Sequence, residues 1–170
     1  MGIIKPFESV KLFIGILHSP EVPFNALQKE LTTIFGAIDY CSAPIEFKHT
    51  NYYNNEIGNS ILKTFVSFKN QISPDTMYRT KINSNQLEEH WLQTGGKRLV
   101  NLDPGIINNY NVILLTTKNY SHRIPLQEGI YAEITLIWKK NDFEDLPWTY
   151  PDFKTPEYKS ILKTIRSKLK

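Results

Sequence analysis

Apolar residues recur along the chain with two periods, one typical of strands and the other of helices. Residues 10–17 are apolar at nearly every position, which indicates a strand covered on both faces and therefore central in its sheet. Residues 38–47, interrupted by a proline, and residues 62–68 predict two further strands. Several more strands are predicted between residues 97 and 138.

Helical spacing of apolar residues predicts a helix at residues 24–35, which Gly36 ends. Farther along, residues 73–75 begin a second helical stretch. Asn85, followed by a glutamate three residues later, predicts another helix start in the manner of a capping box. A last helix is expected after residue 155, because a threonine there can cap a helix whose first residue is proline.

These elements predict an α+β fold, a single domain spanning residues 1–170 with helices packed on one face of a mainly antiparallel sheet. Hydrophobic residues make up 41% and charged residues 22% of the chain, as in an ordinary soluble protein, and no stretch predicts a membrane span. The net charge of +3 is concentrated in the last helix, where cations complement the helix dipole, so nucleic-acid binding is only weakly indicated. The single cysteine, Cys41, excludes an intramolecular disulfide and favours a cytoplasmic location.

Ionisable and amide residues interrupt the predicted strands between residues 97 and 138. Strands disfavour these residue types, so their presence here suggests a specific role. A three-residue hairpin loop ending at Gly129 pairs Arg123 with Glu133, and a four-residue loop at 119–122 sets Lys118 opposite Arg123. This register gathers polar side chains on one sheet face, namely Asn101, Asp103, Thr116, Lys118, Arg123, Tyr131, Glu133 and Thr135. The expected site is therefore a polar face on a rigid sheet.

The leading hypothesis is that this face binds, and in an enzymatic version turns over, a small anionic or phosphate-containing ligand. Lys118 and Arg123 would hold the anion, while Glu133 or Asp103 would serve as base and His122 would supply a proton. Asn101 would orient the ligand, and Thr116 and Tyr131 would line the site. Carboxylates here could hold a hard divalent ion with water, but no ligand spacing predicts a metal and no phosphate-loop, dinucleotide or other cofactor motif is present.

Two other interpretations remain open. The protein could be a non-catalytic RNA- or protein-interaction module, for which the sequence offers the aromatic residues Tyr52, Tyr53, Tyr131, Trp148 and Tyr150. Alternatively the polar residues are purely structural, since Arg123 and Glu133 can form a simple cross-strand ion pair and residues 101–105 read as a turn.

Three blocks of sequence resemble a known family. They are RLVNLDPG at residues 98–105, the TTK, HRI and GIYAE segments within residues 116–133, and WTYPD at residues 148–152. The chain is similar along nearly its whole length to the prokaryotic family catalogued as domain of unknown function 4416, which implies a single domain of unassigned activity. It departs from the family pattern at Ile106 and Pro125, where tyrosine is usual, and at Asn119 in place of aspartate.

Overall fold

One antiparallel sheet, with nine strands in the part of the chain that the structure describes, forms the frame of the protein. This computed structural model describes residues 2–48, 53, 56–58, 60–93 and 96–170. The strands are β1 (Lys11–His18), β2 (Ile38–Cys41), β3 (Ile45–Glu46), β4 (Leu62–Phe68), β5 (Val100–Ile107), β6 (Asn111–Thr116), β7 (Ile124–Pro125), β8 (Tyr131–Lys139) and β9 (Asp142–Asp145). The helices are α1 (Phe24–Phe35), the short 3-10 helix η1 (Pro74–Thr76), α2 (Met77–His90) and α3 (Pro156–Arg166).

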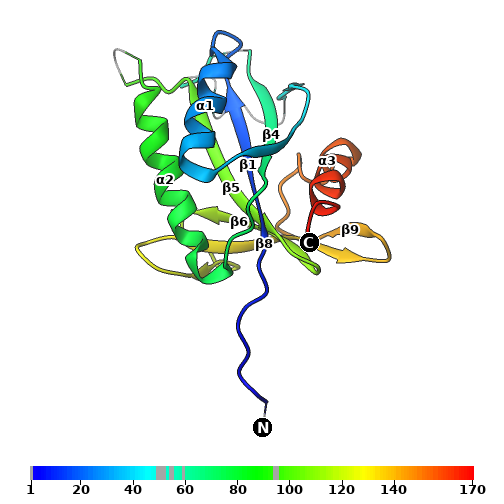
Figure 1. Cartoon of the computed structure of the whole chain (residues 1–170). Helices are drawn as coiled ribbons and strands as arrows, with labels where there is room; N and C mark the ends of the chain where they lie inside the picture. The colour runs from blue at the N-terminus through cyan, green and yellow to red at the C-terminus, as the bar shows by residue number, and fades with distance from the viewer. Residues whose placement is uncertain (1, 49–52, 54–55, 59, 94–95) are drawn as a thin grey trace.

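Strand β1 lies in the interior of the sheet, as its apolar run predicts. The strand order is β2-β4-β1-β5-β6-β8-β7, with β3 also paired to β4 and β9 to β8. All eight residues of β1 are buried, including Lys11, which pairs with Asp39 and donates to the Phe68 carbonyl at 2.6 Å. The long strands stand upright in Figure 1 and β6 and β8 cross them at the foot, so the sheet is strongly twisted.

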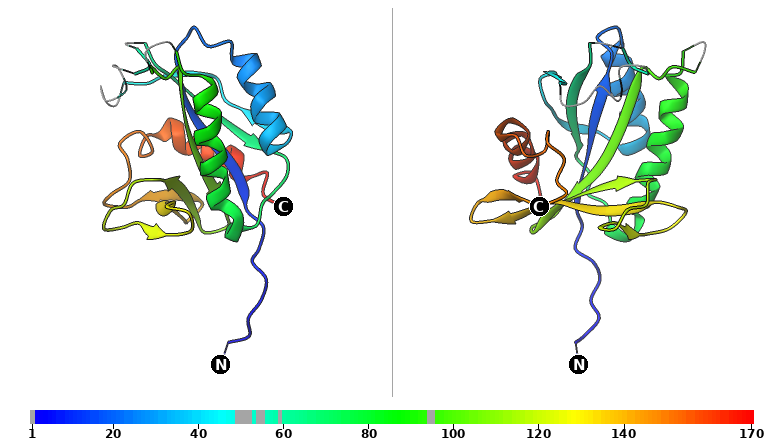
Figure 2. Two further views of the ribbon diagram at one scale, coloured as in Figure 1. Left: turned by 90° about the vertical axis from the view of Figure 1, so that its left-hand side faces the viewer. Right: turned by 180° about the vertical axis from the view of Figure 1, so that it is seen from behind.

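The α+β class and the mainly antiparallel sheet are confirmed, but the helices divide between the two faces. Helices α1 and α2 cover one face, where Leu12 and Ile14 of β1 join the apolar core. Helix α3 lies on the other side, where its Tyr158 and Leu162 pack with Phe13 of β1 (Figure 2). Because β1 and β4 are apolar at both parities, both of their faces must be covered.

Helix α2 is one continuous element, so the predicted second helix start at Asn85 is wrong. The chain passes from η1 directly into α2, and Asn85 lies in its middle. Glu88 does not cap a helix; its Oε1 accepts a hydrogen bond of 2.7 Å from the backbone N–H of Leu102 in β5. The ends of the other two helices are as predicted. Gly36 follows the last residue of α1, and the Thr155 hydroxyl accepts a hydrogen bond from the Tyr158 N–H at the start of α3.

The hairpin between β7 and β8 has the predicted register, with Ile124 opposite Ala132. The preceding pairing is wrong: β6 pairs with β8 and not with β7, so Lys118 is not opposite Arg123 on neighbouring strands. Strand β8 offers β6 a partner along its whole length, whereas β7 has two residues and one of them is Pro125, which lacks the N–H for a ladder.

Strand β5 continues through the segment that the sequence suggests as a turn, and here the sheet divides. Residues Val100–Ile107 all pair with β1, but β6 pairs with β5 only from Gly105 onward. The next pair in this register would join Pro104 to Leu115, and Pro104 has no N–H to donate. Beyond this proline β5 and β6 separate, and α2 lies along the freed edge of β5.

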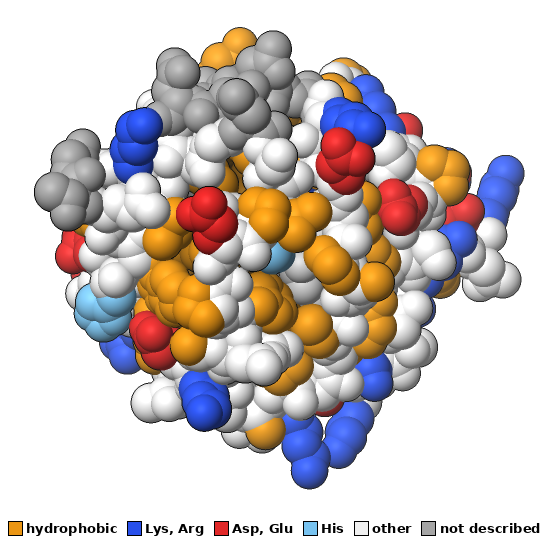
Figure 3. Space-filling model, turned by 90° about the horizontal axis from the view of Figure 1, so that it is seen from above, with side chains coloured by type: hydrophobic (Ala, Val, Ile, Leu, Met, Phe, Trp, Pro, Cys, Tyr) orange, Lys and Arg blue, Asp and Glu red, His pale blue; other side chains and the backbone are white. Residues whose placement is uncertain are grey.

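Hydrophobic side chains gather in the middle of the upper end of the molecule, with charged side chains of both signs around them (Figure 3). At this end β1 leads into α1 (Figure 1). Within the described ranges, none of the helices combines the length and the apolar character that crossing a bilayer requires.

Candidate functional site

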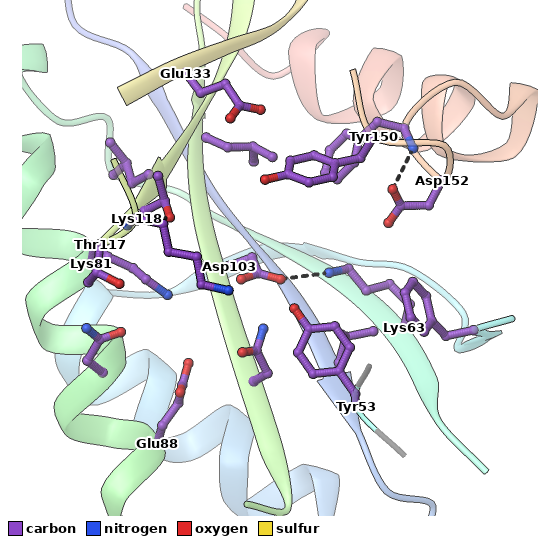
Figure 4. A pocket seen from close by; sticks show the side chains of 18 of the residues that line it. Tyr53, Lys63, Lys81, Glu88, Asp103, Thr117, Lys118, Glu133, Tyr150 and Asp152 are labelled. Atoms are coloured by element: carbon purple, nitrogen blue, oxygen red, sulfur yellow. Dashed lines mark hydrogen bonds and ion pairs between the residues drawn. The ribbon is translucent and has the colours of Figure 1, made fainter. Parts of the chain in front are cut away.

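A cavity of about 700 Å³ opens where β5 and β6 separate. Its walls come from β4, β5, β6, β8, α2 and the segment before α3, so nearly every part of the sheet contributes (Figure 4). Charged side chains from four of these elements line it: Lys63 of β4, Lys81 and Glu88 of α2, Asp103 of β5 and Glu133 of β8. Lys118, in the loop after β6, completes the ring of charge.

Two side chains of α2 replace the missing strand at the free edge of β5. The Lys81 ammonium donates to the Leu102 carbonyl at 2.8 Å, and the Glu88 carboxylate accepts from the Leu102 N–H. The other oxygen of Glu88 accepts from Arg98 at 2.9 Å, and Arg98 also binds Glu56. Burial raises the pKa of Glu88 above its ordinary value, although Lys81, the Leu102 N–H and Arg98 oppose this. The edge can therefore stay open without unpaired backbone groups at Leu102.

Asp103 lies at the centre of the cavity, beside an otherwise buried lysine. The Lys63 ammonium donates to its Oδ2 at 3.2 Å, while 33% of the Asp103 side chain remains exposed. Lys63 crosses over Gly15 of β1, and a Cβ at Gly15 would stand 2.9 Å from the Lys63 Cε. A side chain at position 15 would therefore displace the lysine from this path.

The protonation of Asp103 follows from these neighbours. Burial raises its pKa, but Lys63, Lys81 and Asn101 together lower it by more, so the net pKa lies below the ordinary 3.8. A lowered pKa in the folded state means that ionised Asp103 stabilises the fold above pH 3.8, and that this stabilisation is lost as the pH falls below 3.8.

We expect the free energy of unfolding to decrease less between pH 5 and pH 3 in Asp103→Asn than in the wild type. Urea unfolding at the two pH values measures both decreases, and the buried Lys63 makes the variant less stable at either pH. Other carboxylates titrate in both proteins, so only the difference between the two decreases reports on Asp103. Equal decreases would show that Asp103 has an ordinary pKa.

Glu133 forms the deepest carboxylate of the cavity, and only one of its oxygens is satisfied. The carboxylate is 2% exposed, and its Oε2 accepts from the Arg123 Nε at 2.8 Å and lies 3.0 Å from the His122 Nε2. Among the described residues Oε1 has no hydrogen-bond partner, and Figure 4 shows the carboxylate directed into the cavity. A buried carboxylate oxygen without a partner is costly, so this atom indicates a place for a ligand donor.

The cavity wall beyond Glu133 is a strap, residues 146–153, which carries the WTYPD block. Trp148 donates from its indole to the Ile134 carbonyl at 2.8 Å and stacks on His122, with the ring centres 5.0 Å apart. Arg123 donates to the Tyr150 hydroxyl at 2.7 Å. The polar residues behind Glu133 thus hold the strap in place, and Tyr150 lines the cavity. Burial, with the charge of Glu133, raises the pKa of Tyr150, so the phenol keeps its proton.

Five of the predicted site residues line this one cavity: Asn101, Asp103, Thr116, Lys118 and Glu133. Asn101 contributes to the lowered pKa of Asp103, although its Nδ2 makes no regular hydrogen bond within the described part of the chain. Three others lie outside the lining. Arg123 and His122 stand behind Glu133, and Tyr131 shares a pairing position with Thr116 at the end of β8.

Sequence reasoning did not place Lys63, Lys81 or Glu88 in the site, and it considered Tyr150 only as an aromatic residue of an interaction module. All four line the cavity. A signal for Lys63 exists, because it is the only charged residue in the apolar strand at residues 62–68. Lys81 and Glu88 are seven residues apart, two turns along the same helix face, but that pattern is recognisable only once α2 is known to be one helix. In the described part of the chain, no group of three or more His, Cys, Asp or Glu side chains is arranged to hold a metal ion.

Comparison with known proteins identifies the chain by its sequence family alone. No curated protein and no solved structure matches it. A family model does match, and it covers residues 8–169, which include every residue placed in the cavity. The chain belongs to the family described as "Domain of unknown function (DUF4416)".

Proposed function

We propose that the cavity binds a small anionic molecule carrying a phosphate or carboxylate group. The observation that carries this proposal is the convergence of three ammonium groups on one cavity, from Lys63, Lys81 and Lys118 (Figure 4). Two of these lysines are nearly buried, and lysine is seldom buried without a polar partner. Each ammonium has three donors, and one donor of Lys81 is used by Leu102 and one of Lys63 by Asp103, so further donors remain for a ligand.

The distribution of charge within the site supports an anion, although positive and negative side chains balance over the whole of it. Arg98, Arg123 and Lys63 are each matched by a carboxylate at hydrogen-bonding distance. Lys81 and Lys118 bring two further positive charges, and Asp152 and Glu56, the second partner of Arg98, bring two negative charges. Lys81 of α2 and Lys118 after β6 lie on one side of the cavity and Asp152 on the strap, and a local concentration of positive charge attracts anions.

The anion proposal predicts that Lys118→Ala weakens the binding of propyl phosphate about tenfold, because one charge-assisted hydrogen bond is lost. Isothermal titration calorimetry measures the dissociation constant, and stabilisation against heating provides an independent reading. Lys81 is unsuitable for this test because it also binds the Leu102 carbonyl.

Lys139→Ala is the matched control for Lys118→Ala. Lys139 is exposed and pairs with Glu144 on the β8–β9 hairpin, and it is not among the cavity residues. Melting of both variants without ligand separates any change in fold stability from a change in binding. Equal phosphate affinities in the two variants, or no phosphate binding by the wild type, would contradict the proposed site.

For an enzymatic version, Glu133 is the residue that we propose as proton acceptor. Its Oε1, which has no partner among the described residues, faces the cavity, and Arg123 and His122 hold its other oxygen. Asp103 is paired with Lys63, so we propose an electrostatic role for it, and His122 would orient Glu133 instead of giving a proton to the ligand.

The geometry favours this function over an RNA- or protein-interaction module. That alternative uses Tyr52, which lies outside the described residues, and Tyr53, Tyr131, Trp148 and Tyr150. Trp148 stacks on His122 and donates to the Ile134 carbonyl, and Tyr150 accepts from Arg123. These contacts fix the strap to the sheet. We further propose a reducing, cytoplasmic location, because the only cysteine, Cys41, is free.

A further inference from the structure

We infer that the ligand of this cavity is a hydroxyl-bearing anion of the sugar-phosphate or polyol-phosphate class, in which a hydroxyl group donates to Glu133 Oε1. The inference rests on the proposed anion site and adds to it the chemistry of the rest of the ligand. It begins from the fact that the cavity presents carboxylate acceptors as well as ammonium donors.

Glu133 distinguishes a hydroxyl group from an amine. Its Oε1 needs a hydrogen-bond donor, but its charge is already matched by Arg123 at 2.8 Å. A second cation at this position would therefore find no unmatched charge on Glu133 to pair with. A neutral donor satisfies the oxygen without leaving an excess positive charge there, and a hydroxyl group is the common neutral donor of small metabolites.

The remaining acceptors suit several hydroxyl groups on one ligand. Asp103 is one third exposed and has one oxygen committed to Lys63, so it retains acceptor positions toward the cavity. Asp152 lines the wall with one oxygen accepting from the Phe153 N–H. The protonated phenol of Tyr150 points into the same space (Figure 4), where its O–H can donate to a ligand oxygen.

The apolar part of the lining fits the carbon skeleton of such a ligand. Leu17, Phe47, Leu114 and Phe153 stand between the polar groups. A volume of about 700 Å³ exceeds that of a bare phosphate and lies in the range of pockets for whole small molecules. The dianionic phosphate group of a phosphate ester has only acceptor oxygens, so in such a ligand the donor to Glu133 Oε1 comes from the rest of the molecule.

The test compares two probes that differ only in their hydroxyl groups, glycerol 3-phosphate and propyl phosphate. We expect the wild type to bind glycerol 3-phosphate about tenfold more tightly, as calorimetric dissociation constants measure. In Glu133→Gln the amide carbonyl can accept from Arg123, which turns the NH2 group toward the cavity in place of Oε1. The charge-assisted acceptor is then lost, and the preference ratio should fall to about twofold or less.

The outcomes separate this inference from the function on which it rests. If both probes bind the wild type equally, the hydroxyl inference is overturned while the anion site stands. If the preference persists unchanged in a folded Glu133→Gln, Glu133 is not the acceptor and the inference is also overturned. If neither phosphate binds, both the inference and the proposed function fail. Lys118→Ala should weaken the binding of both probes by the same factor. The ratio of the two dissociation constants should therefore be the same in this variant as in the wild type.

Discussion

Arg123→Met should lower the free energy of unfolding by about 3–5 kcal/mol, which corresponds to roughly 10 °C in Tm for a chain of this size. Arg123 matches the charge of Glu133, whose side chain is 2% exposed. Methionine keeps much of the volume but leaves the carboxylate buried with only His122 beside Oε2. The same substitution removes the hydrogen bond from Arg123 to the Tyr150 hydroxyl, which is one of the contacts that hold the strap. Urea unfolding followed by circular dichroism measures the change.

The double variant Arg123→Met, Glu133→Gln tests the electrostatic origin of this loss. Removing the charge of Glu133 should restore about half of the stability, because the penalty comes from an uncompensated buried carboxylate. If the losses of stability in Arg123→Met and in Glu133→Gln simply add up in the double variant, the two residues do not interact. A strap held by Trp148 and Tyr150 packing alone would then be the better description.

Glu88→Ala should cost about 2–3 kcal/mol, because it removes the acceptor from the buried N–H of Leu102 and one partner of Arg98. The free edge of β5 depends on this side chain, since β6 has already separated at Pro104. Hydrogen exchange at the Leu102 amide should accelerate by more than the loss of global stability explains. That local measurement distinguishes an opened edge from general destabilisation.

Glu88→Gln is the matched control, because its carbonyl oxygen can still accept from Leu102 while the charge is lost. We expect a cost of about 1 kcal/mol and slow exchange at Leu102, as in the wild type. Fast exchange in Glu88→Gln would mean that the charge on Glu88, and not the hydrogen bond, holds α2 against β5. The experiment needs no ligand, so it tests the architecture of the cavity independently of its function.

The sequence by itself determined most of the regular elements and one hairpin of the polar face. The apolar run at residues 10–17 was enough to predict the central strand, and the three-residue loop ending at Gly129 was enough to set β7 against β8. These predictions succeed because they depend on local periods and short turns, which a single stretch of chain encodes. The pairing of Arg123 with Glu133 follows from that loop and is present in the structure.

The tertiary structure alone decided what those residues do. Only the order β6-β8-β7 showed that Arg123 turns to the strap while Lys118 reaches the cavity. The lysines at positions 63 and 81 come from a strand and a helix far from residues 97–138 in the chain. The cavity exists because β5 loses β6 at Pro104 and gains α2 instead. Pro104 explains why the pairing with β6 stops, but the choice of α2 as the new neighbour compares partners across the whole fold, and a local stretch of sequence does not encode that comparison.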